Sequence, residues 1–241
     1  MSSDMAHVPG LNGSVLGEHD GVTVVAFDFD HTLTVGDSVV PFVIRVAGIG
    51  RVLTALVRTL WTVVGLVVRR DNDGLKAHFA RQCLAGIDAD RAATIGIEHA
   101  ERIVGSRMRR DTASRLRAHQ QRGDVVVIVS ASFGEYMHVV GDLLEVDAVL
   151  CTELEQADGV LTGELSGPNC RGAEKVTRIR HWMAEAGLGG GIDVAYGDSS
   201  GDAAMLAAAT RGVLVKHEEL HGLIDTEVAS RDGRDESMGA S

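Results

Sequence analysis

Hydrophobic residues along the chain form short unbroken runs that are separated by longer amphipathic stretches. Short apolar runs bounded by turn residues are typical of strands buried on both faces of a parallel sheet. Such runs occupy residues 22–28, 124–129, 146–152, 192–196 and 212–215. Helical periodicity covers residues 109–121, 175–186 and 218–223, and a hairpin-like alternation covers residues 153–165. This order predicts an α/β protein with a Rossmann-like parallel sheet core.

A long segment without strand patterns follows the first run. It includes two helical patterns, at residues 73–84 and 88–104, each of which begins at Asp, a good N-cap residue. We therefore predict a helical cap inserted into the α/β core. The terminal stretches mix small, polar and charged residues, as disordered tails do. The expected organisation is a disordered tail at 1–21, a core at 22–36 and 107–225, a helical cap at 37–106, and a second disordered tail at 226–241.

The most apolar part of the chain lies inside this predicted cap, at residues 51–69. Residues 52–68 contain one charge, Arg58, and are at the short limit for crossing a membrane. On a helical wheel, Arg51, Arg58 and Arg69 share a narrow polar face, which predicts one amphipathic helix with a broad apolar side. The favoured interpretation is a cap helix packed against its neighbours, because large exposed apolar patches are uncommon. The alternative is peripheral contact with a membrane surface.

Composition narrows the classes of partner. The 241 residues are 45% hydrophobic and 24% charged, as expected for a globular protein with one α/β core and a smaller inserted domain. A formal net charge of −11 argues against a nucleic-acid partner, which would require a basic surface. Cys83, Cys151 and Cys170 have no CxxC spacing, so neither a disulfide framework nor a zinc site is indicated. Residues 1–21 lack the pattern of a secretory signal, and we expect a cytoplasmic protein with free thiols.

Two carboxylates stand where the first apolar run ends. Asp28 closes the run and Asp30 follows two residues later. In open α/β sheets the ligand site lies beyond the carboxyl ends of the strands. Carboxylates this close repel each other unless a cation or a proton lies between them, and Mg²⁺ prefers such oxygen ligands together with substrate phosphate. The alternative is a surface turn that happens to contain two Asp residues.

Polar residues also follow the later runs. Ser130 ends the run at 124–129, where the start of a helix would present N–H groups suited to an anion. A simple helix cap is the alternative for this serine. Lys175 opens the predicted helix at 175–186 and, taken alone, is compatible with an ordinary solvated side chain. Asp198 and Asp202 follow the run at 192–196, so carboxylates again stand between a strand and a helix.

In this order, the residues resemble the four motifs of the haloacid dehalogenase superfamily of phosphohydrolases. The first motif, DxDxT, matches the residues from Asp28 to Thr32. The resemblance implies a Mg²⁺-dependent phosphomonoester hydrolase that works through an aspartyl-phosphate intermediate. The implied roles are the nucleophile for Asp28, the general acid and base for Asp30, phosphate binding for Ser130 and Lys175, Mg²⁺ binding for Asp28, Asp30 and Asp198, and an outer-shell position near Lys175 for Asp202.

The position of the cap, directly after the first motif, resembles the subclass that includes phosphoserine phosphatase. Members of that group have an acidic residue shortly after the first motif, which binds the substrate amine, and Asp37 is the candidate here. They also use an arginine of the cap to bind the substrate carboxylate. Arg81 and Arg91 are the candidates for that role.

Two departures from the phosphoserine phosphatase pattern leave the substrate open. Ala131 and Ser132 follow Ser130 where that group has glycines, and Gly201 stands where that group commonly has Asn. One alternative is a lipid phosphate such as phosphatidylglycerophosphate, with membrane contact through residues 51–69. Another is a non-catalytic phosphate-binding or partner-binding module. The sequence contains no indication of the oligomeric state.

Overall fold

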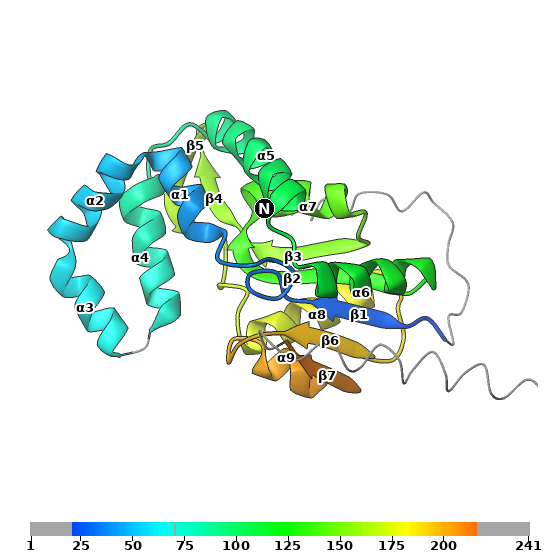
Figure 1. The fold of residues 1–241 in the computed structure, drawn as a ribbon. Helices are drawn as coiled ribbons and strands as arrows, with labels where there is room; N and C mark the ends of the chain where they lie inside the picture. Colours follow the sequence, from blue (N-terminus) through cyan, green and yellow to red (C-terminus); the bar gives the residue numbers. More distant parts are fainter. Residues whose placement is uncertain (1–20, 70, 216–241) are drawn as a thin grey trace, which may run out of the picture.

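Five parallel strands form the central sheet in the computed structural model, which describes residues 21–69 and 71–215. Their spatial order is β3-β2-β1-β6-β7, and every neighbouring pair is parallel (Figure 1). Each strand overlaps one of the apolar runs, so the predicted α/β fold with a Rossmann-like sheet is confirmed. The strands are β1 (Val24–Phe27), β2 (Val125–Phe133), β3 (Ala148–Thr152), β6 (Val194–Gly197) and β7 (Arg211–Leu214).

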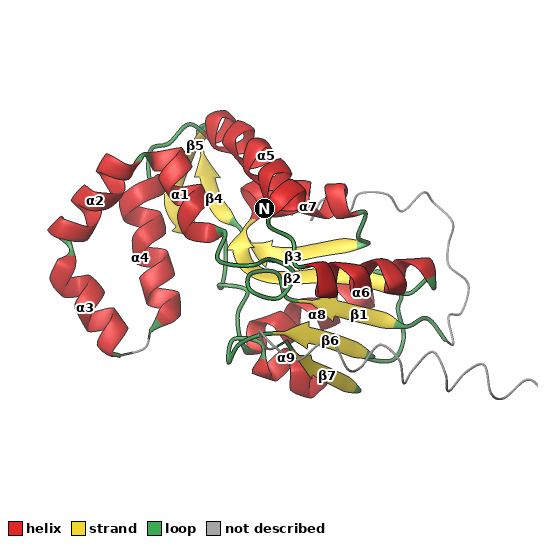
Figure 2. Cartoon of the chain, viewed as in Figure 1, coloured by secondary structure: helices red, strands yellow, loops and turns green. Residues whose placement is uncertain are grey.

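Helices cover both faces of the sheet (Figure 2). Alternate side chains of β1 enter two different hydrophobic clusters: Val25 and Phe27 join one, and Val24 and Ala26 join the other. The first cluster includes side chains of α6 and α7, and the second includes side chains of α8 and α9. Because both faces are buried, most positions of the strands are apolar, as their sequence runs indicate. The helices are α6 (Arg110–Gln121), α7 (Gly134–Leu144), α8 (Ala173–Glu185) and α9 (Ala203–Ala208).

The strand order brings three strand ends to one edge of the sheet. β1 lies between β2 and β6, with Phe27 opposite both Ile128 and Tyr196. The chain leaves β1 toward β2 and β3 on one side, and β6 and β7 occupy the other side. Such a reversal of strand order is where ligands bind in doubly wound sheets. The residues that follow β1 and β6 therefore meet beside β2.

Five helices lie between β1 and the next element of the core, as predicted for the cap. Asp71 and Asp88 cap two of them by accepting hydrogen bonds from Gly74 N–H and Arg91 N–H, both at 2.8 Å. The predicted start at residue 73 is thus two residues late, because Asp71 provides the cap. The helices are α1 (Val39–Ala47), α2 (Ile49–Arg58), α3 (Leu60–Val68), α4 (Asn72–Leu84) and α5 (Ala89–Ser106).

A hairpin from the later part of the chain completes this part of the molecule. The predicted alternation at residues 153–165 forms the antiparallel strands β4 (Leu154–Ala157) and β5 (Val160–Leu165). Leu161 in β5 exchanges backbone hydrogen bonds with Gly86 and Ile87, each of 2.8 Å. The hairpin thereby holds the turn between α4 and α5, beside the helices at the left of Figure 1. The helical insertion thus packs against a two-stranded element of its own chain.

The predicted single helix at residues 51–69 is wrong, because the chain breaks at Thr59 into α2 and α3. Thr59 has φ −117° and ψ 21°, outside helical values. Its hydroxyl donates to the carbonyl of Ala55 at 2.7 Å and lies 2.8 Å from Nε2 of His78 on α4. A β-branched hydroxyl residue that binds the preceding turn commonly disturbs a helix. The contact with α4 fixes the bend at this position.

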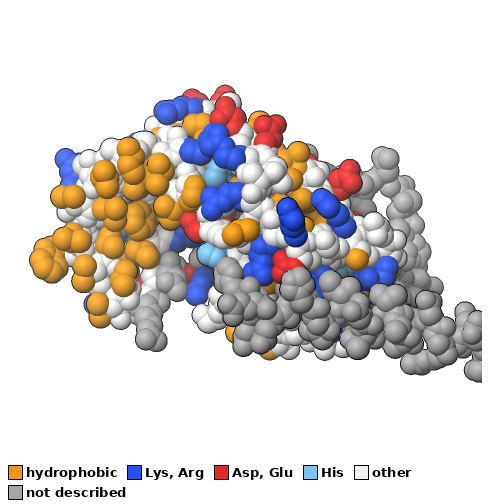
Figure 3. Space-filling model, in the orientation of Figure 1, with side chains coloured by type: hydrophobic (Ala, Val, Ile, Leu, Met, Phe, Trp, Pro, Cys, Tyr) orange, Lys and Arg blue, Asp and Glu red, His pale blue; other side chains and the backbone are white. Residues whose placement is uncertain are grey.

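The favoured burial of this segment is wrong for α3, which contains no buried residue, whereas α2 buries Val52 and Ala55 against its neighbours. Trp61 is 85% exposed, and Val57 and Val68 are 78% and 77% exposed. α3 packs against α4 on one side only, so the rest of its broad apolar surface faces solvent. Figure 3 shows hydrophobic side chains gathered over this end of the molecule. We call the large exposed apolar residues of α2 and α3 the cap patch; they are Ile49, Leu53, Val57, Leu60, Trp61, Val64, Val67 and Val68.

Among the described residues, no single helix is long and apolar enough to cross a membrane. The pair α1 and α2 reaches the required length and hydropathy only together, and the two helices are bent by 105° at their junction. The helix predicted at residues 218–223 lies outside the described residues. The same holds for the predicted tails, apart from Gly21 at the end of the first.

Candidate active site

Asp28 occupies the carboxyl end of β1. Its backbone N–H donates to the carbonyl of Tyr196 at 2.9 Å, so the residue still belongs to the sheet edge. The chain then turns sharply: the carbonyl of Phe29 accepts hydrogen bonds from the N–H groups of Thr32, Leu33 and Thr34. His31 adopts a positive φ of 62° inside this turn. The turn places Asp28 and Asp30 at the same opening.

Lys175 bridges two carboxylates from the deep side of the site. Its Nζ donates to Oδ1 of Asp28 and to Oδ1 of Asp202, both at 2.6 Å. The side chain is 2% exposed. Burial alone would lower the pKa of Lys175, but the negative charges of Asp28 and Asp202 raise it above its usual value. The side chain is therefore a fixed cation between two acidic groups.

Three carboxylates lie around the ammonium group of Lys175, so their negative charges exceed its one positive charge. Oxygen atoms of Asp28, Asp198 and Asp202 all lie within 4.8 Å of one another. Asp202 uses its remaining oxygen to accept from the N–H and hydroxyl of Ser199, at 3.1 and 2.9 Å. Burial and the charge of Asp202 raise the pKa of Asp198. A hard divalent cation such as Mg²⁺ prefers an all-oxygen set of this kind and would relieve its repulsion.

The carboxylate of Asp30 is directed to a different set of partners. Its Oδ1 accepts from the N–H of Ser38 at 2.9 Å, and its Oδ2 accepts from the hydroxyl of Ser132 at 2.6 Å. The Ser38 hydroxyl lies 2.7 Å from the hydroxyl of Tyr136, which extends the network inward. Burial raises the pKa of Asp30 to about 6, although the hydrogen bonds from Ser132 and Ser38 oppose this rise. Asp30 is therefore suited to proton transfer near neutral pH.

Ser130 lies inside β2, so the predicted helix N-terminus at this residue is wrong. β2 continues to Phe133, and α7 begins only at Gly134. The pairing of β2 with β3 shifts register between Val129 and Phe133, an irregularity of the kind that is common beside active sites. The Ser130 hydroxyl accepts a hydrogen bond from the N–H of Ser132 at 3.0 Å. Ser130 nevertheless faces the same pocket as the carboxylates.

One pocket collects most of the predicted residues together with others that motif reasoning missed. Arg171 lines it, immediately beside Gly201: a Cβ built on Gly201 would lie 3.1 Å from Nε of Arg171. Phosphoserine phosphatases commonly have Asn at the position of Gly201. The glycine in this chain leaves room for the side chain of Arg171, a second cation beside Lys175. The lining residues are Asp28, Asp30, His31, Ser130, Ala131, Arg171, Lys175, Asp198, Ser199, Gly201 and Asp202.

The residues expected to bind the amine and the carboxylate of the substrate do not line this pocket. Asp37 accepts a hydrogen bond from the N–H of Val40 at 2.9 Å, at the start of α1, and its charge contributes to the raised pKa of Asp30. Arg81 makes a two-pronged ion pair with Glu164 of β5, at 2.5 and 2.6 Å. Arg91 lies exposed in the first turn of α5. Asp37 therefore remains near the site, whereas Arg81 is already paired.

Comparison with known proteins places the whole arrangement in a family. The model of the haloacid dehalogenase-like hydrolases matches residues 25–207. Protein CicA of Caulobacter vibrioides is 34% identical over 210 residues, which cover 87% of each chain. The phosphoserine phosphatase SerB2 of Mycobacterium tuberculosis is 28% identical over 191 residues, covering 79% of this chain and 43% of that protein.

Solved structures have the same fold. A protein of unknown function from Bordetella pertussis Tohama I is similar with a TM-score of 0.67 and 22% identity, over 79% of this chain and 89% of that one. A phospho-aspartyl intermediate analogue of phosphoserine phosphatase is similar with a TM-score of 0.55 and 19% identity, over 78% and 83%. The resemblance inferred from the motifs is thereby confirmed. The chain belongs to the haloacid dehalogenase-like hydrolase family, and it is an enzyme of that hydrolase class.

Proposed function

We propose that this chain is a Mg²⁺-dependent phosphomonoester hydrolase that forms an aspartyl-phosphate on Asp28. The observation that carries the proposal is the contact of Asp28 with Lys175 inside a group of three carboxylates at a strand end. Asp30 stands at the same opening with a pKa raised by burial to about 6. A nucleophilic carboxylate, a fixed cation and a neighbouring proton carrier are the parts that phosphoryl transfer requires.

We assign to the side chains the roles that the family resemblance implies, and their positions support this assignment. Asp28 would attack the phosphorus, while Lys175 and Ser130 hold the phosphoryl oxygens. Asp30 would first give its proton to the leaving oxygen and then take a proton from the water that releases the phosphate. Asp28, Asp198 and the backbone carbonyl of Asp30 would hold Mg²⁺, with Asp202 behind them. Bound there, the cation would neutralise charge on the transferring phosphoryl group.

Arg171 adds to this positive side of the site. It lines the same pocket as Lys175, and the missing side chain at Gly201 leaves space for its guanidinium. A planar guanidinium can bind two oxygens of a phosphate at once. We assign it to the substrate phosphate, together with Ser130 and Lys175.

The substrate class that we propose first is a small cytoplasmic phosphomonoester of the phosphoserine type. The support is the set of curated relatives, which includes phosphoserine phosphatases such as SerB2. Asp37 is the acidic residue near the first motif that would bind a substrate amine. The pairing of Arg81 with Glu164 removes one of the two candidates for the substrate carboxylate.

A panel of phosphomonoesters tests this proposal. Phosphoserine, sugar phosphates, nucleotides and lysophospholipid phosphates are incubated with the full chain in Mg²⁺ and again after chelation. We expect Mg²⁺-dependent release of phosphate from at least one class, and loss of that release in Asp28→Asn. A folded wild-type protein that binds phosphate but hydrolyses nothing in the panel would favour the non-catalytic module.

A lipid phosphate is the second candidate substrate, and the cap patch is the observation that favours it. The patch is apolar and exposed, and two exposed arginines lie at the ends of its helices: Arg58 ends α2, and Arg69 is the C-cap of α3. Arginine near an anionic membrane surface contributes about 1 kcal/mol to binding. In the panel, preferential hydrolysis of the lysophospholipid phosphates would select this candidate over phosphoserine.

A further inference from the structure

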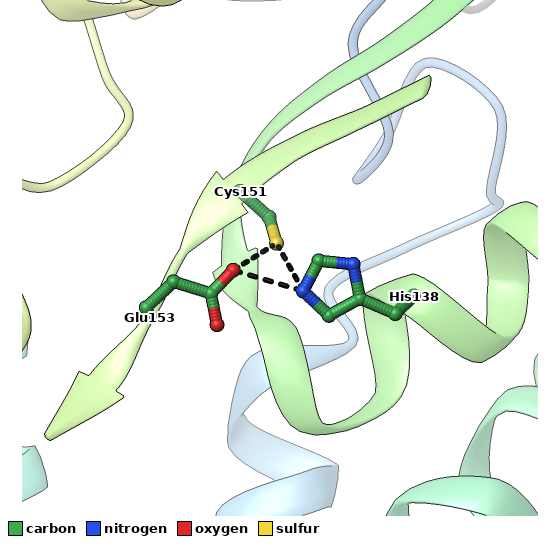
Figure 4. Close-up of side chains that lie close together, drawn as sticks. All are labelled: His138, Cys151 and Glu153. Carbon is green, nitrogen blue, oxygen red and sulfur yellow. Dashed lines mark hydrogen bonds and ion pairs between the residues drawn. The ribbon is translucent and has the colours of Figure 1, made fainter. Parts of the chain in front are cut away.

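His138, Cys151 and Glu153 form a second cluster of ligand-type side chains, which the proposed reaction does not use (Figure 4). His138 lies on α7, Cys151 lies in β3, and Glu153 lies between β3 and β4. Oε1 of Glu153 is 2.9 Å from Nε2 of His138 and 3.2 Å from Sγ of Cys151. Sγ of Cys151 is 3.8 Å from Nε2 of His138. One atom from each side chain thus points to a common centre.

These three separations, 2.9, 3.2 and 3.8 Å, lie on both sides of the edge lengths of a tetrahedral metal site and within about 0.4 Å of them. Zn²⁺ with bonds of about 2.0 to 2.3 Å to oxygen, nitrogen and sulfur places its ligand atoms about 3.3 to 3.6 Å apart. A thiolate, an imidazole and a carboxylate are ligands that suit Zn²⁺, whereas the all-oxygen group around Asp28 suits Mg²⁺. We propose that His138, Cys151 and Glu153 bind a zinc ion.

Glu135 lies near these side chains, outside the group whose three ligand atoms are within 4.8 Å of one another. It precedes His138 by three residues on α7, so the two side chains lie on the same face of the helix. Its Oε2 is buried and has no hydrogen-bond partner among the described residues. A buried carboxylate oxygen without a partner is costly, and a nearby cation removes that cost. Glu135 is therefore the candidate for a fourth ligand of the proposed site.

The absence of a side chain at Gly134 leaves space for the carboxylate of Glu153. A Cβ at this position would collide with the Glu153 carboxylate, so only glycine lets that carboxylate reach the start of α7. Cys151 is 2% exposed, but the side chains of His138 and Glu153 are 36% and 42% exposed. An ion can therefore reach the buried sulfur from the side of the imidazole and the carboxylate.

A zinc ion here would join the first turns of α7 to the connection between β3 and β4. The residues just before α7 include Ser130 and Ser132, which lie at the active site, and α7 itself carries Tyr136 of the Asp30 network. The role that follows is structural. Metal binding contributes to the free energy of folding and keeps the segment with Ser130 and Ser132 in place at the active site.

Cobalt substitution tests the site, because a thiolate bound to Co²⁺ gives an intense charge-transfer absorption band that carboxylates do not. The full chain without a polyhistidine tag is stripped with a chelator and given excess Mg²⁺ to fill the carboxylate group. It is then titrated with Co²⁺. We expect one Co²⁺ per chain with the thiolate band, and displacement of the band by Zn²⁺. A folded wild-type protein without the band would overturn the proposal.

Two variants and a matched control locate the ligands. Cys151→Ser should abolish the band, whereas Cys170→Ser, at another buried free cysteine whose Sγ donates to the carbonyl of Leu150, should keep it. His138→Gln changes a partly exposed ring and should weaken Co²⁺ binding at least about tenfold, with the fold checked by circular dichroism. A full band in Cys151→Ser, or unchanged affinity in His138→Gln, contradicts the assignment.

Discussion

Nζ of Lys175 lies 2.6 Å from Oδ1 of Asp28, although the two residues are 147 positions apart in the chain. The contact joins the end of β1 to the first turn of α8 and buries both charged groups. A buried ammonium between two carboxylates is stable only while all partners are present. The same contact therefore orients the proposed nucleophile and holds the sheet edge together.

Lys175→Met should destabilise the folded protein strongly. The substitution leaves Asp28 and Asp202 buried and mutually repelling, which costs about 3 to 5 kcal/mol of unfolding free energy. Urea unfolding at neutral pH measures this loss. Added Mg²⁺ should recover more stability in the variant than in the wild type, because a cation replaces the lost charge. The control is Lys76→Met, which removes a lysine that donates to Asn169; equal losses in the two variants would contradict the account.

Ser132→Ala should shift the pH dependence of hydrolysis. Asp30 must be protonated to act as an acid, so activity should fall as pH rises through its pKa, about 6 in the wild type. The Ser132 hydroxyl stabilises the ionised carboxylate, and its removal raises that pKa. The falling limb of the pH–rate profile should move upward by about one pH unit, the equivalent of one hydrogen bond to a charged group.

Ser114→Ala is the matched control for this shift, because Ser114 donates to a backbone carbonyl on the exposed side of α6. Its profile should coincide with that of the wild type. A limb that stays in place in Ser132→Ala, or moves to lower pH, would remove Asp30 from the role of general acid.

Asp37→Asn separates substrate binding from chemistry. If Asp37 binds a substrate amine, the substitution should raise KM for phosphoserine about tenfold, equivalent to about 1.4 kcal/mol. An amine-free phosphomonoester should keep its KM, because the Asn side chain can still cap α1. Steady-state kinetics on the two substrates provides the comparison. Equal changes for both substrates would show that Asp37 acts only on the start of α1.

The cap patch predicts binding to anionic membranes, a property that can be tested separately from catalysis. If the protein contacts membranes, Trp61→Glu should abolish co-sedimentation with anionic liposomes, because it places a charge at the most exposed residue of the patch. Ile97→Glu on α5 is the control, since Ile97 is also exposed but lies outside the patch. Wild-type protein that stays in the supernatant at low salt would exclude the membrane-contacting cap and its lipid substrate.

The strands and the carboxylates at their ends could be predicted because each signal is local. An apolar run followed by Asp28 identifies a buried strand and its carboxyl end, and the order of strands in doubly wound sheets then brings Asp198 to the same edge. Family motifs indicated Lys175 and Asp202, whose mutual contact the structure shows. These features require no knowledge of side-chain packing.

Other features depend on contacts that no local pattern contains. The break at Thr59 is fixed by His78 on another helix, and the burial of α3 depended on neighbours that the cap does not provide. Ser132 contacts Asp30 from 102 residues away, at a position where the phosphoserine phosphatase pattern has glycine. The extension of β2 past Ser130 likewise follows from pairing with β3. The cluster of Cys151 with His138 and Glu153 contains a single cysteine, so cysteine spacing could not reveal it.

Trapping of the phosphoryl group on the enzyme tests the central claim most directly. The wild-type chain with Mg²⁺ is mixed with a phosphomonoester that it hydrolyses, quenched in acid during turnover, and digested for mass spectrometry. We predict an acyl-phosphate on Asp28, and none in Asp28→Asn. Phosphate release without any phosphorylated enzyme, or a phosphoryl group on a residue other than Asp28, would contradict the account.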